Sequence, residues 1–217
     1  MIHDISPLVD DAIAVWPGDT PYTSRDVLRL EEGASVHLSA ITLSCHTGAH
    51  ADAPGHTARG APGIDRVPLE PYLGPCVLLD ARPRDGVVRL RDLREEEIAG
   101  ASRLLLRTRD GDDRTVFPAS FASLDPELVD ELGRRGVVLV GLDTPSVDRF
   151  DSKDLPSHRA LLRHGMANLE SLALAGVPAG RYELIALPLR LSGRDASPVR
   201  AVLRSLPAEG GAGRSLP

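Results

Sequence analysis

The chain has 217 residues, of which 42% are hydrophobic and 26% are charged. This length fits one large domain, and these proportions are typical of a folded protein and argue against disorder over most of the chain. A formal net charge of −6 argues against the basic surface that nucleic-acid-binding proteins usually carry. No apolar run approaches the roughly 18–20 residues of a membrane helix, and aspartates interrupt the first thirty positions, unlike a signal peptide. We therefore expect a cytoplasmic protein that binds neither nucleic acid nor membrane.

Apolar runs bounded by turn residues predict the strands. Residues 36–45 alternate in polarity, with Ile41, Leu43 and Cys45 on one face, as in a strand with one buried side. Leucine-rich or β-branched runs predict further strands, several of them buried on both faces, at residues 75–81, 102–108, 137–142 and 182–191.

Helices fit between these runs, at residues 91–99, 126–135 and 156–164. The middle helix has the clearest ends, because Asp125 can cap it, Pro126 takes its first position and Gly136 ends it. Together the elements predict a mixed α/β fold with more strand than helix. The glycine-rich residues 208–217 are expected to form a flexible tail, which leaves one domain over residues 1–207.

Three histidines and one aspartate are concentrated in a short segment that directly follows the first predicted strand. They are His46, His50, Asp52 and His56, and most residues between them are small. Small residues let the backbone turn tightly, so His46, His50 and Asp52 can converge on one centre. Imidazole nitrogens and a carboxylate oxygen are the ligands expected for zinc or another borderline divalent metal. The two oxygens of Asp52 could also bridge two metals.

Further ligands would have to come from later in the chain. His158 and His164 are six residues apart, so on one helix they face different directions and are not expected to share a metal. His164 also suits a helix C-terminus, where the helix dipole favours a cation. Glu170 enters an apolar stretch, where a carboxylate needs a partner that a metal would supply. On spacing alone, Glu170 is only a candidate.

Cysteine and tryptophan are rare in this chain, and their number limits the kinds of site that it can form. Cys45 and Cys76 are the only cysteines, so they can form neither a disulfide framework nor a four-cysteine zinc site. Trp16 is the only tryptophan in a chain with 3% aromatic residues. From its sequence context alone, Trp16 is a core or turn aromatic.

The histidine-rich segment resembles the His-x-Gly-[Thr/Ala]-His-x-Asp-x-Pro-x-His signature of the metal-dependent cyclase-like hydrolases. Within that family, several blocks are similar to those of the bacterial kynurenine formamidases (arylformamidases): residues 4–7, 16–21, 141–146, 151–153, 177–180, 182–189 and 195–203. The resemblance extends from Ile2 to about Pro207. It implies a compact α/β domain with a mixed, barrel-like sheet and flanking helices, the swivelling β/β/α arrangement, and it implies a homodimer.

The resemblance implies a metal-binding role for five residues. His46, His50 and Asp52 match the first metal ligands, and Asp52 matches a carboxylate that reaches both ions of a two-zinc site. His158 matches the histidine ligand of the second metal. Glu170 matches a carboxylate that contacts both. Two divalent ions per subunit, with zinc as the expected metal, are therefore implied.

The resemblance also implies the reaction. His56 matches the general acid/base, and Trp16 matches the aromatic residue that lies against the substrate ring. The implied activity is hydrolysis of N-formyl-L-kynurenine to L-kynurenine and formate in tryptophan degradation. Two positions depart from the family pattern, because Thr57 replaces a common aromatic and Arg159 replaces a common second histidine. Thr57 could change how the aryl ring packs, and Arg159 leaves His158 as the one available ligand there.

Two other functions stay open. Related enzymes open cyclic amides such as isatin, and the same metal ions and aromatic platform would serve that reaction. A non-catalytic metal-binding protein is the other alternative. A structural zinc site, however, is usually closed by four protein ligands, often cysteines, whereas His56 here stands uncommitted beside the predicted site.

Overall fold

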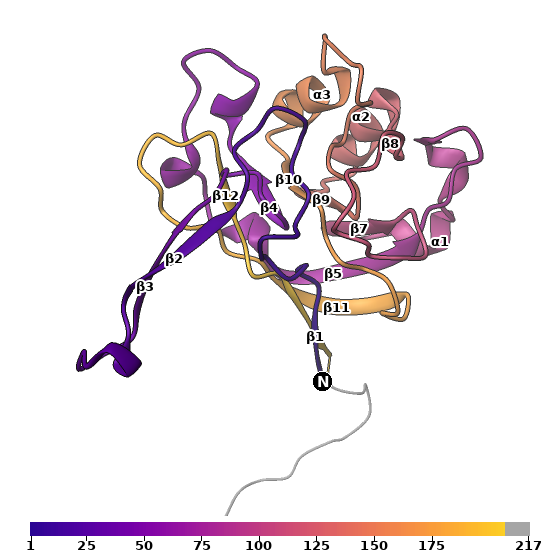
Figure 1. The fold of residues 1–217 in the computed structure, drawn as a ribbon. Coiled ribbons are helices and arrows are strands. Elements are labelled where there is room, and N and C mark those ends of the chain that lie inside the picture. Colours follow the sequence, from indigo (N-terminus) through magenta and orange to yellow (C-terminus); the bar gives the residue numbers. More distant parts are fainter. Residues whose placement is uncertain (207–217) are drawn as a thin grey trace, which may run out of the picture.

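One curled sheet of nine strands forms the frame of the protein (Figure 1). The computed structural model describes residues 1–206, so the predicted tail at 208–217 lies outside the described residues. In spatial order the strands are β1 (Ile2–Asp4), β13 (Val202–Ser205), β11 (Gly180–Ile185), β5 (Leu73–Asp80), β7 (Arg103–Arg107), β9 (Leu139–Leu142), β10 (Ala167–Glu170), β4 (His50–Asp52) and β12 (Ala196–Pro198). Strands β5, β7, β9 and β10 run parallel, and the other neighbours are antiparallel. This mixed, half-barrel sheet with few helices confirms the predicted α/β class.

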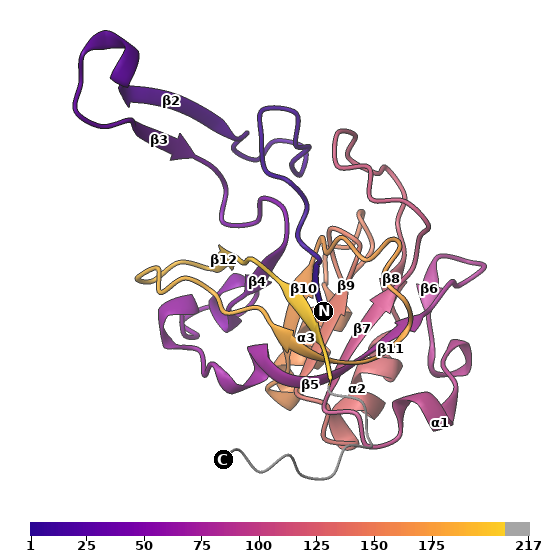
Figure 2. The same cartoon turned by 90° about the horizontal axis from the view of Figure 1, so that it is seen from below.

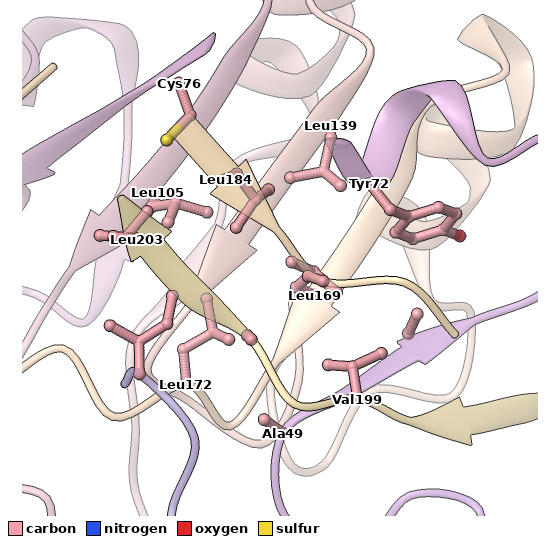
Figure 3. Close-up of a cluster of buried hydrophobic side chains, with 14 of the residues drawn as sticks. Ala49, Tyr72, Cys76, Leu105, Leu139, Leu169, Leu172, Leu184, Val199 and Leu203 are labelled. Carbon is pink, nitrogen blue, oxygen red and sulfur yellow. The ribbon is translucent and has the colours of Figure 1, made fainter. Parts of the chain in front are cut away.

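The central strands are buried on both faces, as their apolar runs predicted. In β7, Leu105 packs inside the curl of the sheet, whereas Leu104 and Leu106 pack on the opposite face. Figure 3 shows the inner cluster, in which Leu105, Leu139, Leu169, Leu184 and Leu203 come from five different strands. The inner cluster therefore holds β10 against the rest of the sheet.

Three helices cover the other face of the sheet: α1 (Glu95–Ile98), α2 (Pro126–Arg134) and α3 (Pro156–His164). Helix α2 begins as predicted, because the side chain of Asp125 accepts a hydrogen bond from the backbone of Glu127 at 2.9 Å. The predicted helix at 91–99 is shorter than expected and is split into a 3-10 turn (Leu90–Asp92) and α1. Further 3-10 turns lie at Leu30–Glu32, Pro54–His56, Ile64–Arg66 and Glu70–Tyr72. No helix within residues 1–206 is long and apolar enough to cross a membrane.

The strand predicted at 36–45 forms in part but does not have the predicted buried face. It is β3 (Leu38–Thr42), and it pairs only with β2 (Thr23–Leu28). This hairpin extends away from the body of the protein in both views (Figures 1 and 2). Ile41 is 58% exposed, because no second layer covers the hairpin. A second small sheet joins β6 (Val87–Val88) and β8 (Ser123–Leu124).

Candidate metal centre

Two neighbouring strands of the main sheet carry the first potential ligands. His50 and Asp52 occupy alternate positions of β4 and therefore point to the same face. The antiparallel neighbour β10 places Glu170 directly opposite His50. The sequence predicted these ligands in the turn after the 36–45 strand, but His50 and Asp52 lie on a separate three-residue strand. The small Ala51 between them is fully buried, which lets this strand enter the sheet.

A tight turn before β4 orients the imidazole of His50. Gly48 has a φ of +65°, in the left-handed region, and a Cβ there would lie 3.2 Å from a methyl carbon of Val9. The carbonyl of Gly48 accepts a hydrogen bond from Nδ1 of His50 at 2.8 Å. Because Nδ1 donates this hydrogen bond, Nε2 is the nitrogen that is directed toward the carboxylates.

Asp52 lies against three histidines, and Glu170 lies against two of the same three. Asp52 Oδ1 lies 3.2 Å from His46 Nδ1 and 3.6 Å from His50 Nε2, and its Oδ2 lies 3.4 Å from His158 Nε2. Glu170 Oε2 lies 3.4 Å from His50 Nε2, and its Oε1 lies 3.6 Å from His158 Nε2. Each carboxylate therefore reaches two potential metal positions, one beside His50 and one beside His158.

His158 reaches this centre from the first turn of α3, where Asp148 holds it. Nδ1 of His158 donates to Asp148 Oδ2 at 2.7 Å. The same carboxylate accepts the backbone N–H groups of Ser157 and His158, at 2.9 and 3.0 Å. Asp148 therefore caps the helix and orients the imidazole at once. No pattern in the sequence had assigned Asp148 a role.

Unpaired buried atoms show that these residues fit a metal. His50, Asp52, His158 and Glu170 are each 6% exposed or less. Within the described residues, His50 Nε2, His158 Nε2 and Asp52 Oδ1 are buried without a hydrogen-bond partner. Buried polar atoms are normally paired, because leaving them unpaired costs free energy. Divalent cations beside His50 and His158 would satisfy all three atoms, and the mixed nitrogen and oxygen ligands suit zinc.

The electrostatics of the metal-free centre favour protonated histidines. Burial lowers the pKa of His158, but its hydrogen bond with Asp148 and its contact with Asp52, 3.4 Å away, outweigh burial and raise it to about 10. Burial also lowers the pKa of His46, and its contacts with Asp52 and Asp195 raise it to about 9. Burial would raise the pKa of Asp52, yet His158 and His46 hold it well below its usual value. A metal ion must therefore displace protons from these imidazoles.

His46 and His56 lie side by side at the more open edge of the centre, with ring centroids 4.5 Å apart. Asp195 joins them, because its Oδ2 lies 3.0 Å from His46 Nε2 and 3.5 Å from His56 Nδ1. His46, Asp52 and His56 form one group with metal-binding atoms close together, and His50, Asp52 and Glu170 form another. The position of His56 thus suits either a ligand or a proton carrier. Sequence analysis assigned no role to Asp195, although the block 195–203 carried part of the resemblance.

Asn168 is a further residue that sequence analysis missed. Its side-chain amide donates to Asp52 Oδ2 at 2.8 Å and to Glu170 Oε1 at 3.2 Å. The backbone N–H of Val147 donates to Glu170 Oε1 at 2.9 Å. These donors fix the orientation of both carboxylates. Asn168 and Glu170 alternate on β10 and share a face, which is the only signal that could have identified Asn168.

A pocket of about 370 Å³ adjoins the centre, and Trp16 lines it together with His46, His50, His56, His158 and Glu170. All three phenylalanines of the chain surround Trp16, with centroids 5.2 Å (Phe117), 6.3 Å (Phe121) and 5.1 Å (Phe150) from its ring. Trp16 is therefore part of an aromatic wall beside the centre. Thr57 lines a second pocket together with Asp52 and His158 and is not part of this wall.

His164 lies apart from the centre. Its Nε2 is 2.9 Å from Asp130 Oδ1, where α3 packs on α2. His158 and His164 therefore face different surroundings from the two ends of α3, as their spacing predicted.

Comparison with known proteins gives a consistent match. The model of the family described as "Putative cyclase" matches residues 3–149, more than half of the chain. A solved structure described as a potential metal-dependent hydrolase with cyclase activity is 27% identical, with a TM-score of 0.80 over 94% of this chain and 96% of that chain. A predicted metal-dependent hydrolase from Bacillus stearothermophilus is 26% identical, with a TM-score of 0.79 over 94% and 97%. Isatin hydrolase A from Ralstonia solanacearum shares the fold, at 22% identity and a TM-score of 0.80 over 94% and 91%.

Proposed function

The chain belongs to the cyclase family, and on this premise we propose that it is a metal-dependent amidohydrolase that hydrolyses N-formyl-L-kynurenine to L-kynurenine and formate. One observation carries the proposal. Two buried carboxylates, Asp52 and Glu170, each extend between His50 and His158, whose Nε2 atoms are unpaired, beside a pocket lined by Trp16. The two solved structures of similar fold, described as a potential and a predicted metal-dependent hydrolase, support a hydrolytic reaction.

We propose two divalent ions, with zinc as the expected metal. His46 and His50 would hold one ion and His158 the other, and Asp52 and Glu170 would contact both. Divalent metals in such sites supply hydroxide at neutral pH and polarise a carbonyl oxygen. Asn168, Asp148 and Gly48 keep the ligand atoms oriented before any ion binds.

The remaining residues of the site supply proton transfer and binding. Hydrolysis of a formamide adds the oxygen of water to the formyl carbon, breaks the carbon–nitrogen bond and delivers one proton to the departing aniline nitrogen. His56 would carry that proton, because imidazole exchanges protons near neutral pH. Asp195 would hold the ring from Nδ1, at 3.5 Å. Trp16 and Phe117 offer apolar faces to the aryl group.

A cyclic amide such as isatin is the second candidate substrate. The fold is shared with isatin hydrolase A from Ralstonia solanacearum at a TM-score of 0.80, and an aromatic wall would accept a fused ring equally well. The same metal ligands and His56 would serve both reactions.

The test is hydrolysis of N-formyl-L-kynurenine by protein of known metal content, before and after chelation, with isatin in parallel. Release of L-kynurenine that chelation abolishes and zinc restores supports the proposal. Turnover of isatin alone would keep the metal centre and reject the formamide substrate. Inertness toward both substrates in the metal-loaded protein would reject the proposed function.

A further inference from the structure

In addition to the metal centre, the pocket is lined by a cation and an anion that each have one buried polar atom without a hydrogen-bond partner among the described residues. Arg109 and Asp112 both line it, three residues apart in the segment that follows β7. Among the described residues, Arg109 Nε and Asp112 Oδ1 are buried and have no hydrogen-bond partner. We propose that these two side chains bind the α-amino-acid group of the substrate, with Arg109 contacting the carboxylate and Asp112 the ammonium. The inference rests on the proposed function and specifies its substrate class.

The neighbouring charged residues of the same segment are already paired. Arg114 donates two hydrogen bonds to Asp10, at 2.6 and 2.8 Å. Asp113 Oδ1 accepts from the backbone and the hydroxyl of Thr115, at 2.9 and 2.7 Å. These contacts shape the loop and use the groups that could otherwise bind a ligand. Arg109 and Asp112 therefore stand out, because each keeps a buried polar atom without a partner.

Asp112 is anchored so that one oxygen stays free. Its Oδ2 accepts the backbone N–H of Ala175 at 3.0 Å, whereas Oδ1 is unpaired. Burial raises the pKa of this carboxyl group, and the hydrogen bond from Ala175 and the charge of Arg109 oppose that rise. An ammonium group at Oδ1 would stabilise the buried carboxylate, because a buried charge is costly without a partner.

Arg109 also starts from a fixed backbone. Its N–H donates to Asp143 Oδ2 at 3.1 Å, and the N–H and hydroxyl of Thr108 bond to the same carboxyl group. Asp143 is fully buried, so the start of the loop is tied to the end of β9. A guanidinium on a rigid base is suited to a carboxylate, because its planar fork can donate two parallel hydrogen bonds.

Arg109 and Asp112 would let the enzyme distinguish between the two candidate substrates. N-Formyl-L-kynurenine carries both a carboxylate and an ammonium on its side chain, whereas isatin carries neither. A neutral aryl formamide would use only the aromatic wall and the metal centre. We therefore expect the enzyme to prefer substrates with an intact α-amino-acid group.

The experiment compares three aryl formamides that share the same reacting group. They are N-formyl-L-kynurenine, its analogue without the amino group, and 2-formamidoacetophenone, which has neither charge. In the zinc-loaded protein we expect Arg109→Gln to lower kcat/KM for N-formyl-L-kynurenine about 10-fold or more, mainly through KM, because a charged hydrogen bond is lost. Asp112→Asn should lower kcat/KM for N-formyl-L-kynurenine but not for the analogue without the amino group. Neither variant should change turnover of 2-formamidoacetophenone more than about twofold.

Arg134→Gln is the matched control, because Arg134 is exposed on α2 and its side chain bonds to Glu131 on the same helix. Binding of L-kynurenine and of 2-aminoacetophenone, measured by calorimetry, provides a readout that does not need turnover. Tighter binding of L-kynurenine than of 2-aminoacetophenone, lost in Arg109→Gln, would support the amino-acid site. Failure to hydrolyse any of the formamides would reject the proposed function but not this site. Equal losses on all three substrates, or equal binding of both ligands by the unmodified protein, would overturn the amino-acid site.

Discussion

Nδ1 of His158 donates a hydrogen bond to Oδ2 of Asp148 at 2.7 Å, and this contact joins the metal centre to the N-terminus of α3. The same carboxylate accepts two backbone N–H groups from the first turn of the helix. Helix stability and ligand orientation therefore depend on one buried residue, which is 2% exposed.

Asp148→Ala should weaken both properties. Loss of the helix cap should lower the free energy of unfolding of the metal-free protein by about 1–2 kcal/mol. Loss of the partner of Nδ1 should lower metal affinity about 10–100-fold. Chemical denaturation and competitive zinc titration measure the two effects. The control is Asp151→Ala, since Asp151 is exposed and pairs with the neighbouring Arg149. Unchanged zinc affinity would show that His158 does not need this orientation.

Asp52→Ala should remove metal from both positions. Its two oxygens face different histidines, at 3.2 Å from His46 and 3.4 Å from His158, whereas Glu170 lies against His50 and His158 and does not replace the contact with His46. We expect elemental analysis to fall from two ions per subunit to none after gel filtration. Asp110→Ala, on an exposed loop, should keep both ions. Two retained ions in the Asp52 variant would rule out a shared carboxylate.

His56→Ala tests whether His56 carries protons or binds metal. We expect the variant to keep both ions and to lose about 100-fold or more of kcat, because general acid/base catalysis contributes about that much. His37→Ala is the control, since His37 lies on the exposed hairpin, where its ring bonds to Asp26. If metal content fell in parallel with activity, His56 would instead be a ligand, as its closeness to His46 and Asp52 also allows.

The elements with local signals are those that the sequence predicted well. Helix α2 has an aspartate cap, a proline at its first position and a buried stripe of leucines, so its start follows from local chemistry. Strands β7 and β9 are apolar runs buried on both faces. By contrast, β4 and β12 have three residues each, too few for periodicity to show. The hairpin strand β3 has the alternation of a half-buried strand, but alternation cannot tell whether another layer will cover it.

The residues of the candidate site also fall into those that the local sequence predicted and those that it did not. The histidine-rich segment was visible because its polar residues are close together in the sequence. Asp148, Asn168 and Asp195 were not assigned, because each meets its partner through the tertiary fold. Asn168, for example, contacts Asp52 across 116 positions of the chain. Their role is to orient the ligands, and orientation has no signature in residue spacing.

The stability of the metal-free protein should depend on pH above neutrality. The carboxylates raise the folded-state pKa of His158 to about 10 and that of His46 to about 9, from an ordinary value of 6.5. Protonated imidazoles therefore stabilise the folded state fully below about pH 6.5, and this contribution is lost as pH rises toward 9–10. Thermal denaturation in a chelator should give a Tm that falls between pH 6.5 and 9.

Added zinc should have the opposite pH dependence. Because the ion competes with protons for the same nitrogens, the rise in Tm on adding zinc should grow between pH 6 and 8. His158→Gln should reduce the slope of the metal-free protein, whereas His164→Gln, at the other end of α3, should change it less. If the Tm of the metal-free protein rose between pH 6.5 and 9, it would contradict protonated His158 and His46 in the folded state.

The projecting hairpin carries an exposed apolar surface. Six large apolar residues on it are between 43% and 58% exposed: Val27, Leu28, Leu30, Val36, Leu38 and Ile41. A two-stranded sheet alone in water is marginally stable, and an apolar surface of this kind is typical of an interface. We propose that the hairpin packs against a second copy of the chain, in the homodimer that the family resemblance implies.

Removal of the hairpin tests the dimer without disturbing the core. Thr23 and Thr42 are direct partners at its base, so a short glycine-rich turn can replace residues 24–41. We expect light scattering to show a dimer for the unmodified protein and a monomer for the shortened one, with circular dichroism unchanged. Leu38→Glu should weaken the dimer, whereas Leu69→Glu, at an equally exposed site outside the hairpin, should not. A shortened protein that stayed dimeric would move the interface to another surface.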